Sequence, residues 1–172
     1  MMRSDWFARI PPSWQARIVR WGFNHHPAWR GTGGRVIHVS PGIDHIRVRL
    51  SLSRRTRNMV GSIFGGSLFA VTDGPHPAML IHALGPDYIV WDKSAAIRYR
   101  KPGYGTLFAD FRVPPEEVAR IRRTLETQPE LDCTYLVELR DEEGVVHAQV
   151  ERTLYIAHKA HYKQKKVERN KA

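Results

Sequence analysis

The apolar residues of this chain follow two different spacings, and the switches between them divide it into elements. From Ser13 they recur at helical intervals, which predicts a helix with Ser13 as its N-cap. The expected apolar face of this helix consists of Trp14, Ile18, Trp21 and Phe23. Gly22 and Pro27 end the helical pattern, and a glycine-rich loop follows.

From residue 35 the spacing becomes two, which is typical of half-buried strands. Residues 43–52 alternate most clearly, with an aliphatic side chain at every second position from Ile46. A Pro-Gly turn joins them to residues 35–40, so the two segments predict an antiparallel hairpin. The remaining expected elements are strands at 88–99, 105–113, 131–140 and 145–157, and a short helix from Pro114 to about 125.

A nearly all-apolar segment begins near Ile63 and predicts a helix that is buried on most sides. Pro75 and Pro77 lack the N–H groups that a continuous helix needs. We therefore expect the helix to end or kink near Asp73 and to resume through residues 79–84.

The order of elements predicts the α+β class, with a curved antiparallel sheet of about six strands wrapped around one central helix. At 172 residues with 42% apolar side chains, the chain can bury one core, so we expect a single folded domain. Residues 1–34 would supply an extra N-terminal helix and loop, residues 35–157 the domain, and residues 158–172 a tail.

The formal net charge is +10, and the tail carries half of it, because residues 158–172 contain six Lys or Arg and one acid. With no apolar periodicity, this tail is expected to be disordered. Such basicity is compatible with binding to nucleic acid. However, the basic residues do not alternate with aromatic ones as they do in base-stacking surfaces, so this partner is disfavoured.

The compartment is indicated by the single cysteine and by the absence of targeting signals. Cys133 has no second cysteine with which to form a disulfide, which suits a reducing environment. The first residues lack the continuous apolar core of a secretory signal, and no stretch approaches the roughly 20 apolar residues that cross a bilayer. We expect a soluble cytoplasmic protein.

Several strings of residues, in register, carry a resemblance to a known family. Asn58, Gly61, the run Phe64-Gly65-Gly66 and Asp73 match the motif of PaaI-like thioesterases of the hotdog fold, in which an acid follows a glycine pair by two turns. Residues 65–70, 72–73, 87–95 and 97–103 resemble a hotdog family of unknown function whose members are often labelled tetrameric acyl-CoA thioesterases. The similarity covers roughly residues 36–157.

The chain departs from this motif at two places. Phe64 stands where the group has a histidine before the glycine pair, so any role of that imidazole is absent. Gly74 separates Asp73 from Pro75, where the group has the acid directly before proline.

The resemblance implies hydrolysis of acyl thioesters, with coenzyme A as part of the substrate and no separate cofactor. Asp73 would activate or orient water, and the backbone N–H groups near Gly65 and Gly66 would hold the oxyanion at a helix start. Asn58 would position water or the loop. Asp73 could equally cap the helix that restarts at Pro75, and the glycines could only permit close helix packing.

Geometry adds an expectation about assembly. Seven residues separate Gly66 from Asp73, about 10 Å along a regular helix, which is too far for one reacting carbonyl to touch both. An antiparallel helix from a second subunit would place the Asp73 of one chain beside the Gly66 of the other. A homodimer or a dimer of dimers is therefore expected, as the resemblance also implies.

Other candidate residues would bind the substrate. Phe64 and Ser67 would line the acyl pocket or belong to the core, and Arg55 and Arg57 would suit the phosphates of coenzyme A. A second basic patch is formed by Arg98, Arg100 and Lys101. The neighbours Asp92 and Lys93 would either contribute to the site or form a surface ion pair.

Competing functions stay open. A metal site is not expected, because the histidine pairs His25-His26 and His158/His161 lack a ligand cluster of suitable spacing. A hotdog dehydratase or hydratase would need a histidine paired with an acid, for which His76 and His82 are the candidates. A non-catalytic binder of acyl-CoA is the remaining alternative, favoured by Phe64.

Overall fold

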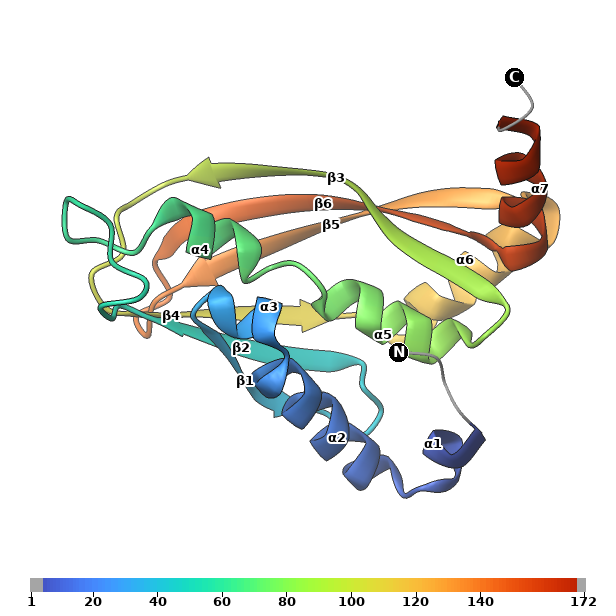
Figure 1. The fold of residues 1–172 in the computed structure, drawn as a ribbon, viewed down its shortest axis with the longest axis horizontal. Coiled ribbons are helices and arrows are strands. Elements are labelled where there is room, and N and C mark those ends of the chain that lie inside the picture. The colour runs from blue at the N-terminus through green and yellow to red at the C-terminus, as the bar shows by residue number, and fades with distance from the viewer. Residues whose placement is uncertain (1–4, 170–172) are drawn as a thin grey trace.

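The computed structural model describes residues 5–169 (Figure 1). One antiparallel sheet in the order β1-β2-β4-β5-β6-β3 curves around α4 and α5, which confirms the expected α+β architecture. Its strands are β1 Gly34–Val39, β2 His45–Ser51, β3 Tyr88–Tyr99, β4 Thr106–Arg112, β5 Glu130–Arg140 and β6 Val146–His158. The helices of the described residues are α1 Asp5–Arg9, α2 Pro12–His25, α3 Pro27–Gly31, α4 Gly65–Ala70, α5 Pro75–Leu84, α6 Pro115–Thr127 and α7 Lys159–Arg169.

The predicted hairpin of β1 and β2 forms, and its alternation fixes which face of the sheet is buried. Ile46, Val48 and Leu50 are buried, and the arginines between them are exposed. Each of these three pairs across to an apolar residue of β4, for example Ile46 with Phe111. The same face continues into β6, so the concave side of the sheet is the apolar core that α4 and α5 cover.

The central helix is two helices, so the break expected near Asp73 is confirmed, but the first helix ends at Ala70, before it reaches that acid. α4 ends at Ala70, and α5 starts at Pro75 after Gly74, whose φ of 96° is a conformation that favours glycine. Pro75 suits the first position of a helix because it needs no N–H partner there. Thr72 and Asp73 therefore lie in a loop, and the two-turn spacing from Gly66 to Asp73 does not hold.

The N-terminal helix is present as α2, but its predicted cap is wrong and its predicted apolar face is only partly right. Pro11 is the N-cap in place of Ser13, and Trp14 and Trp21 are 55% and 63% exposed. Asn24 attaches the helix to the sheet, because its side-chain amide accepts from the N–H of Val36 and donates to the Val36 carbonyl, both at 2.9 Å. The amide thus satisfies the backbone at the β1 edge.

The tail also differs from its expected disorder, because residues 159–169 form α7. Lys165 places its ammonium 2.7 Å from the Glu130 carboxylate, and His161 lies 3.3 Å from the same group. The hydrogen bond from Lys165 is the largest of the contacts that lower the pKa of Glu130 to about 2. These contacts join α7 to β5, and residues 170–172 lie outside the described part of the chain.

Candidate active site

The start of α4 leaves two backbone donors unused. The amides of Ser67 and Leu68 donate to the carbonyl of Phe64, at 3.0 and 3.2 Å. Within residues 5–169, the amides of Gly65 and Gly66 have no acceptor, as is usual for the first N–H groups of a helix. This pair of free donors is the arrangement that an oxyanion requires.

Two exposed aromatic side chains lie against these glycines and occupy the space where their Cβ atoms would be. A Cβ added to Gly65 would lie 2.8 Å from the Tyr99 hydroxyl, and one added to Gly66 would lie 2.2 Å from a ring carbon of Phe64. Both rings are more than half exposed. Tyr99 comes from β3 and therefore adds a hydroxyl beside the free amides that the sequence motifs had not indicated.

Asp73 lies in the loop between α4 and α5, with its side chain 63% exposed. Its carboxylate is 3.8 Å from Nη1 of Arg152, a residue of β6. Arg152 was not among the residues expected in the site. The structure thus gives the candidate base a cationic neighbour from a distant part of the chain.

Arg152 is only 3% exposed, and its guanidinium is held on several sides. Its Nε donates to the Thr72 hydroxyl at 3.0 Å, its Nη1 donates to Asp92 at 2.8 Å, and its plane lies 5.2 Å from the ring centre of Phe69. A signal for Arg152 was present in the sequence, because it occupies an inward position of β6, in phase with Val150 and Leu154. A buried arginine must be paired, so such a position indicates nearby acids.

The cluster of Asp73, Asp92 and Arg152 perturbs the titration of Asp73. Partial burial is the largest cause and raises the pKa of Asp73, although much of the side chain is open to water. Arg152 opposes this shift, whereas the charge of Asp92 and a hydrogen bond with it add to the increase. A carboxylate with a raised pKa is a better proton acceptor than an ordinary aspartate.

The neighbours Asp92 and Lys93 separate in the structure. A register shift between Asp92 and Ser94 leaves Lys93 out of the pairing with β6. Asp92 contacts Arg152, whereas the Lys93 ammonium lies 2.5 Å from Asp132 in an exposed ion pair. Asp92 is thus brought into the cluster, and Lys93 is not.

The remaining predicted residues surround the α4 start. Asn58 is used inside its own loop, since its amide donates to the Ser62 hydroxyl and accepts from the amides of Val60 and Ser62. Ser67 is buried on α4. Arg55 and Arg57 are exposed in the loop that leads to the helix.

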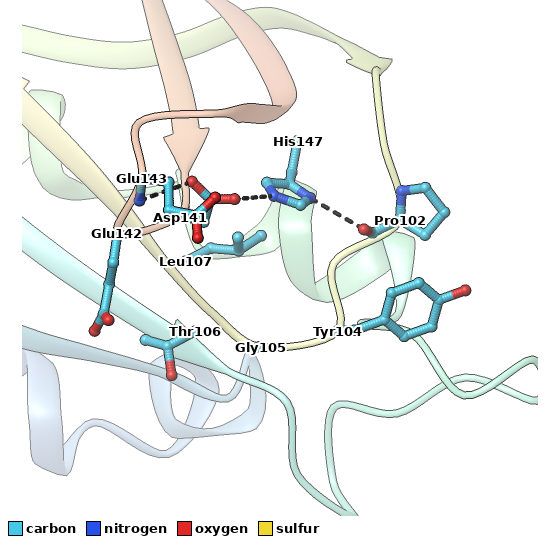
Figure 2. Close-up of a pocket in the computed structure, with 9 residues that line it drawn as sticks. All are labelled: Pro102, Tyr104, Gly105, Thr106, Leu107, Asp141, Glu142, Glu143 and His147. Atoms are coloured by element: carbon cyan, nitrogen blue, oxygen red, sulfur yellow. Dashed lines mark hydrogen bonds and ion pairs between the residues drawn. The ribbon is translucent and has the colours of Figure 1, made fainter.

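A separate hollow of about 410 Å³ contains a histidine–acid pair (Figure 2). His147 has one ring nitrogen 3.0 Å from Asp141 and the other 3.1 Å from the carbonyl oxygen of Pro102. Both ring nitrogens are occupied in tying the β5–β6 turn to the segment after β3. Because neither nitrogen faces free space, this pair is a structural clasp.

Residues 5–169 hold neither a cluster of metal ligands nor a helix that could span a membrane. In these residues, no group of three or more His, Cys, Asp or Glu side chains is placed to hold a metal ion. This includes the regions around His25-His26 and His158/His161. In the same residues, no helix is both long enough and apolar enough to cross a membrane.

Comparison with known proteins supports the same architecture. A sequence family described as "Domain of unknown function (DUF4442)" matches residues 15–156. No curated protein matches the sequence. A Pseudomonas aeruginosa protein of unknown function, described as a probable thioesterase, superposes with a TM-score of 0.74 at 19% identity, covering 83% of this chain and 95% of that one.

Two further solved structures are similar at lower scores. A thioesterase from Haemophilus influenzae has a TM-score of 0.62 at 13% identity, with 83% of this chain and 90% of that one covered. The Escherichia coli PaaI protein, from the phenylacetic acid degradation operon, has a TM-score of 0.54 at 17% identity, with 83% and 96% covered. At these identities the likeness concerns the fold, and it confirms the hotdog architecture that the sequence motifs indicate.

Proposed function

We propose that this chain, which belongs to the family of the domain of unknown function DUF4442, hydrolyses acyl thioesters such as acyl-CoA. The observation that carries the proposal is the cluster of Asp73, Asp92 and Arg152 one short helix away from two unused amide donors. Hydrolysis of a thioester needs both parts, a proton acceptor for water and donors for the developing oxyanion.

In the proposed reaction, Asp73 accepts a proton from a water molecule as the water oxygen attacks the thioester carbonyl. The negative charge that develops on the carbonyl oxygen is held by the amides of Gly65 and Gly66, beside the Tyr99 hydroxyl. The C–S bond then breaks, the sulfur takes the proton that Asp73 had accepted, and a free thiol and a carboxylic acid leave. Arg152 acts on Asp73 as a counter-ion and does not touch the substrate.

The site is proposed to be shared between two copies of the chain. β3 forms one edge of the sheet, pairs only with β6 among the described strands, and exposes Trp91 and Tyr99. An open edge strand is a template for pairing with a second copy. Because most of α4 and the loop after it separate Gly66 from Asp73, pairing along β3 would allow one copy to supply the amides and the other the acid.

Coenzyme A would enter as part of the substrate, and no separate cofactor is proposed. Arg55 and Arg57 are exposed near the α4 start and suit its phosphates. Phe64 and Ser67 would contact the acyl part next to the carbonyl.

A second candidate function, binding of acyl-CoA without hydrolysis, is favoured by Phe64 in place of the expected histidine. A dehydratase or hydratase is less well supported. His76 is buried between Phe111 and Tyr135, and no carboxylate pairs with it among the described residues. It does not form the histidine–acid pair that such chemistry needs.

The test is thiol release from acetyl-, octanoyl-, hexadecanoyl- and benzoyl-CoA by the wild type and Asp73→Ala. Turnover that falls by about 10²-fold or more in the variant is expected of a general base. Asp110→Ala is the matched control, because this exposed acid on β4 pairs with His45 outside the site. Retention of acyl-CoA without any turnover would refute the hydrolase and leave the binder.

A further inference from the structure

An apolar groove of about 920 Å³ lies between the N-terminal helices and the outer side of α5. This volume lies in the range of small-molecule sites. Four aromatic rings contribute to its walls, and two of its apolar side chains, Trp6 and Ile81, are 54% and 40% exposed. The aromatic walls are Trp6, Phe7, Phe23 and Trp29. Open apolar surface of this extent marks a site of interaction.

The charges at the groove restrict what can occupy it. Asp73 is the one carboxylate among the lining residues, and none of them is a lysine or an arginine. Two histidines, His26 and His82, also line the groove, so a ligand with a negative group would meet no permanently charged cation there. A neutral apolar group is therefore favoured, and Asp73 makes the groove continuous with the proposed catalytic loop.

Gly22 keeps one wall of the groove free of a side chain. It lies within α2 and lines the groove, and a Cβ added there would meet nothing within 4 Å. Glycine is a poor helix former, and no neighbour in the described structure requires one at this position. A ligand in the groove would use the space that a side chain at this position would fill.

We propose that this groove binds the apolar acyl group of the thioester, an inference that rests on the proposed function. The acyl chain runs from the carbonyl at Asp73 between α2 and α5, covered by the aromatic walls. The substrates are therefore thioesters of bulky, uncharged acyl groups, in preference to acetyl or dicarboxylic ones. After hydrolysis the acid product carries a negative charge beside Asp73, which favours its release.

The test separates chain binding from hydrolysis by using S-decyl-coenzyme A, a thioether that has the alkyl chain but no carbonyl. Calorimetry compares its affinity with that of coenzyme A alone. Burial of a methylene strengthens binding about fourfold, so a preference for the thioether of about thirtyfold or more is expected in the wild type.

Two glycine variants provide the matched comparison. Gly22→Leu should reduce this preference by about tenfold or more, because the new side chain fills the groove. Gly31→Leu should leave it unchanged, since Gly31 also has open space at its Cβ but does not line the groove. Ile81→Glu is a second groove variant, and its partly exposed site allows a charge without loss of folding.

Each outcome bears on the proposal. If Gly22→Leu and Ile81→Glu lose the preference and Gly31→Leu keeps it, the result supports binding of the acyl chain in the groove. This holds even if thiol release shows that the protein hydrolyses nothing. The proposal is overturned if the wild type shows no preference for the thioether, or if both groove variants retain the preference. Either result leaves the proposed hydrolysis untouched, because thiol release tests that separately. A changed oligomeric state in Gly22→Leu with unchanged preference would show that a second copy covers the groove, which also overturns it.

Discussion

Replacing His76 with phenylalanine tests whether this histidine is a buried neutral ring or a chemical group of the site. His76 is 3% exposed, stacks on Tyr135 at 4.4 Å between ring centres and meets Phe111 edge-on at 5.2 Å. Burial, with a smaller contribution from the charge of Arg152, lowers its pKa to about 4. Phenylalanine keeps a ring in the stack and removes the titration.

The sign of the effect follows from where the proton binds. An unfolded histidine takes up a proton below about pH 6.5, whereas folded His76 does so only near its pKa of about 4. The folded state therefore has its full stability above pH 6.5 and loses it as the pH falls toward 4. A difference of about 2.5 pH units at roughly 1.4 kcal/mol each amounts to about 3 kcal/mol from this group.

The assay is urea unfolding, followed by tryptophan fluorescence, at several pH values from about 7.5 down to about 4.5. The free energy of unfolding should fall less steeply with acid in His76→Phe than in the wild type, by about 3 kcal/mol at the acid end. His25→Phe, at an exposed position, should behave as the wild type. Parallel curves for wild type and His76→Phe would refute the reasoning. Loss of thiol release in a folded His76→Phe would show that this histidine is a chemical group of the hydrolytic site.

Other predictions concern the acid cluster, the glycine pair and the tail. In the pH profile of kcat/KM, Asp92→Asn should move the acid limb to lower pH and Arg152→Met should move it to higher pH, because Asp92 raises and Arg152 lowers the pKa of Asp73. A shift in the same direction for both would contradict this role of the cluster. Replacing both Asp73 and Asp92 with asparagine leaves Arg152 buried without a counter-charge. The free energy of unfolding in urea should therefore fall by about 2–3 kcal/mol. This is less than for a fully buried ion pair, because Asp73 is open to water. Adding Arg152→Met should recover most of this loss, and a double variant as stable as the wild type would show that the carboxylates do not hold the arginine. Gly66→Ala should lower thiol release by about 10²-fold, because its methyl group keeps the thioester carbonyl from reaching the backbone N–H group, which the variant retains. The free energy of unfolding should change little, since the exposed Phe64 ring beside it can move. Deletion of residues 159–172 should lower the free energy of unfolding by about 1 kcal/mol or less and leave thiol release intact, because exposed ion pairs contribute little. Lost activity in a folded truncated protein would instead show that α7 has a role in the site.

Much of the fold follows from local patterns in the sequence. The alternation of Ile46, Val48 and Leu50 with arginines determines a strand with one buried face, whatever its partner is. Proline and glycine determine where helices stop, as at Gly74-Pro75. The apolar residues from 63 to 84 identify the segment that the sheet surrounds. These signals are local, because backbone geometry and side-chain spacing act over a few residues.

The local patterns were less informative for residues whose spacing is compatible with either a buried or an exposed position. Trp14 and Trp21 have helical spacing but point to solvent, because Asn24 and the edge of β1 set which side of α2 faces the sheet. The basic tail lacks an apolar period, yet residues 159–169 form a helix. Lys165 and His161 of this helix contact the carboxylate of Glu130 in β5. In both cases the deciding contacts come from elsewhere in the chain.

Local patterns along the chain predict the sheet, the buried helical segment and the candidate acid Asp73. The position of Arg152 between Asp73 and Asp92, some 80 residues further along, follows only from the packing of the folded chain. The same packing leaves an apolar groove beside the N-terminal helices, and this groove ends at Asp73. The pairing of charges and the closure of a cavity depend on distances in space. These distances are set by antiparallel strand pairing and helix packing, and the local periodicity of the sequence carries no information about them.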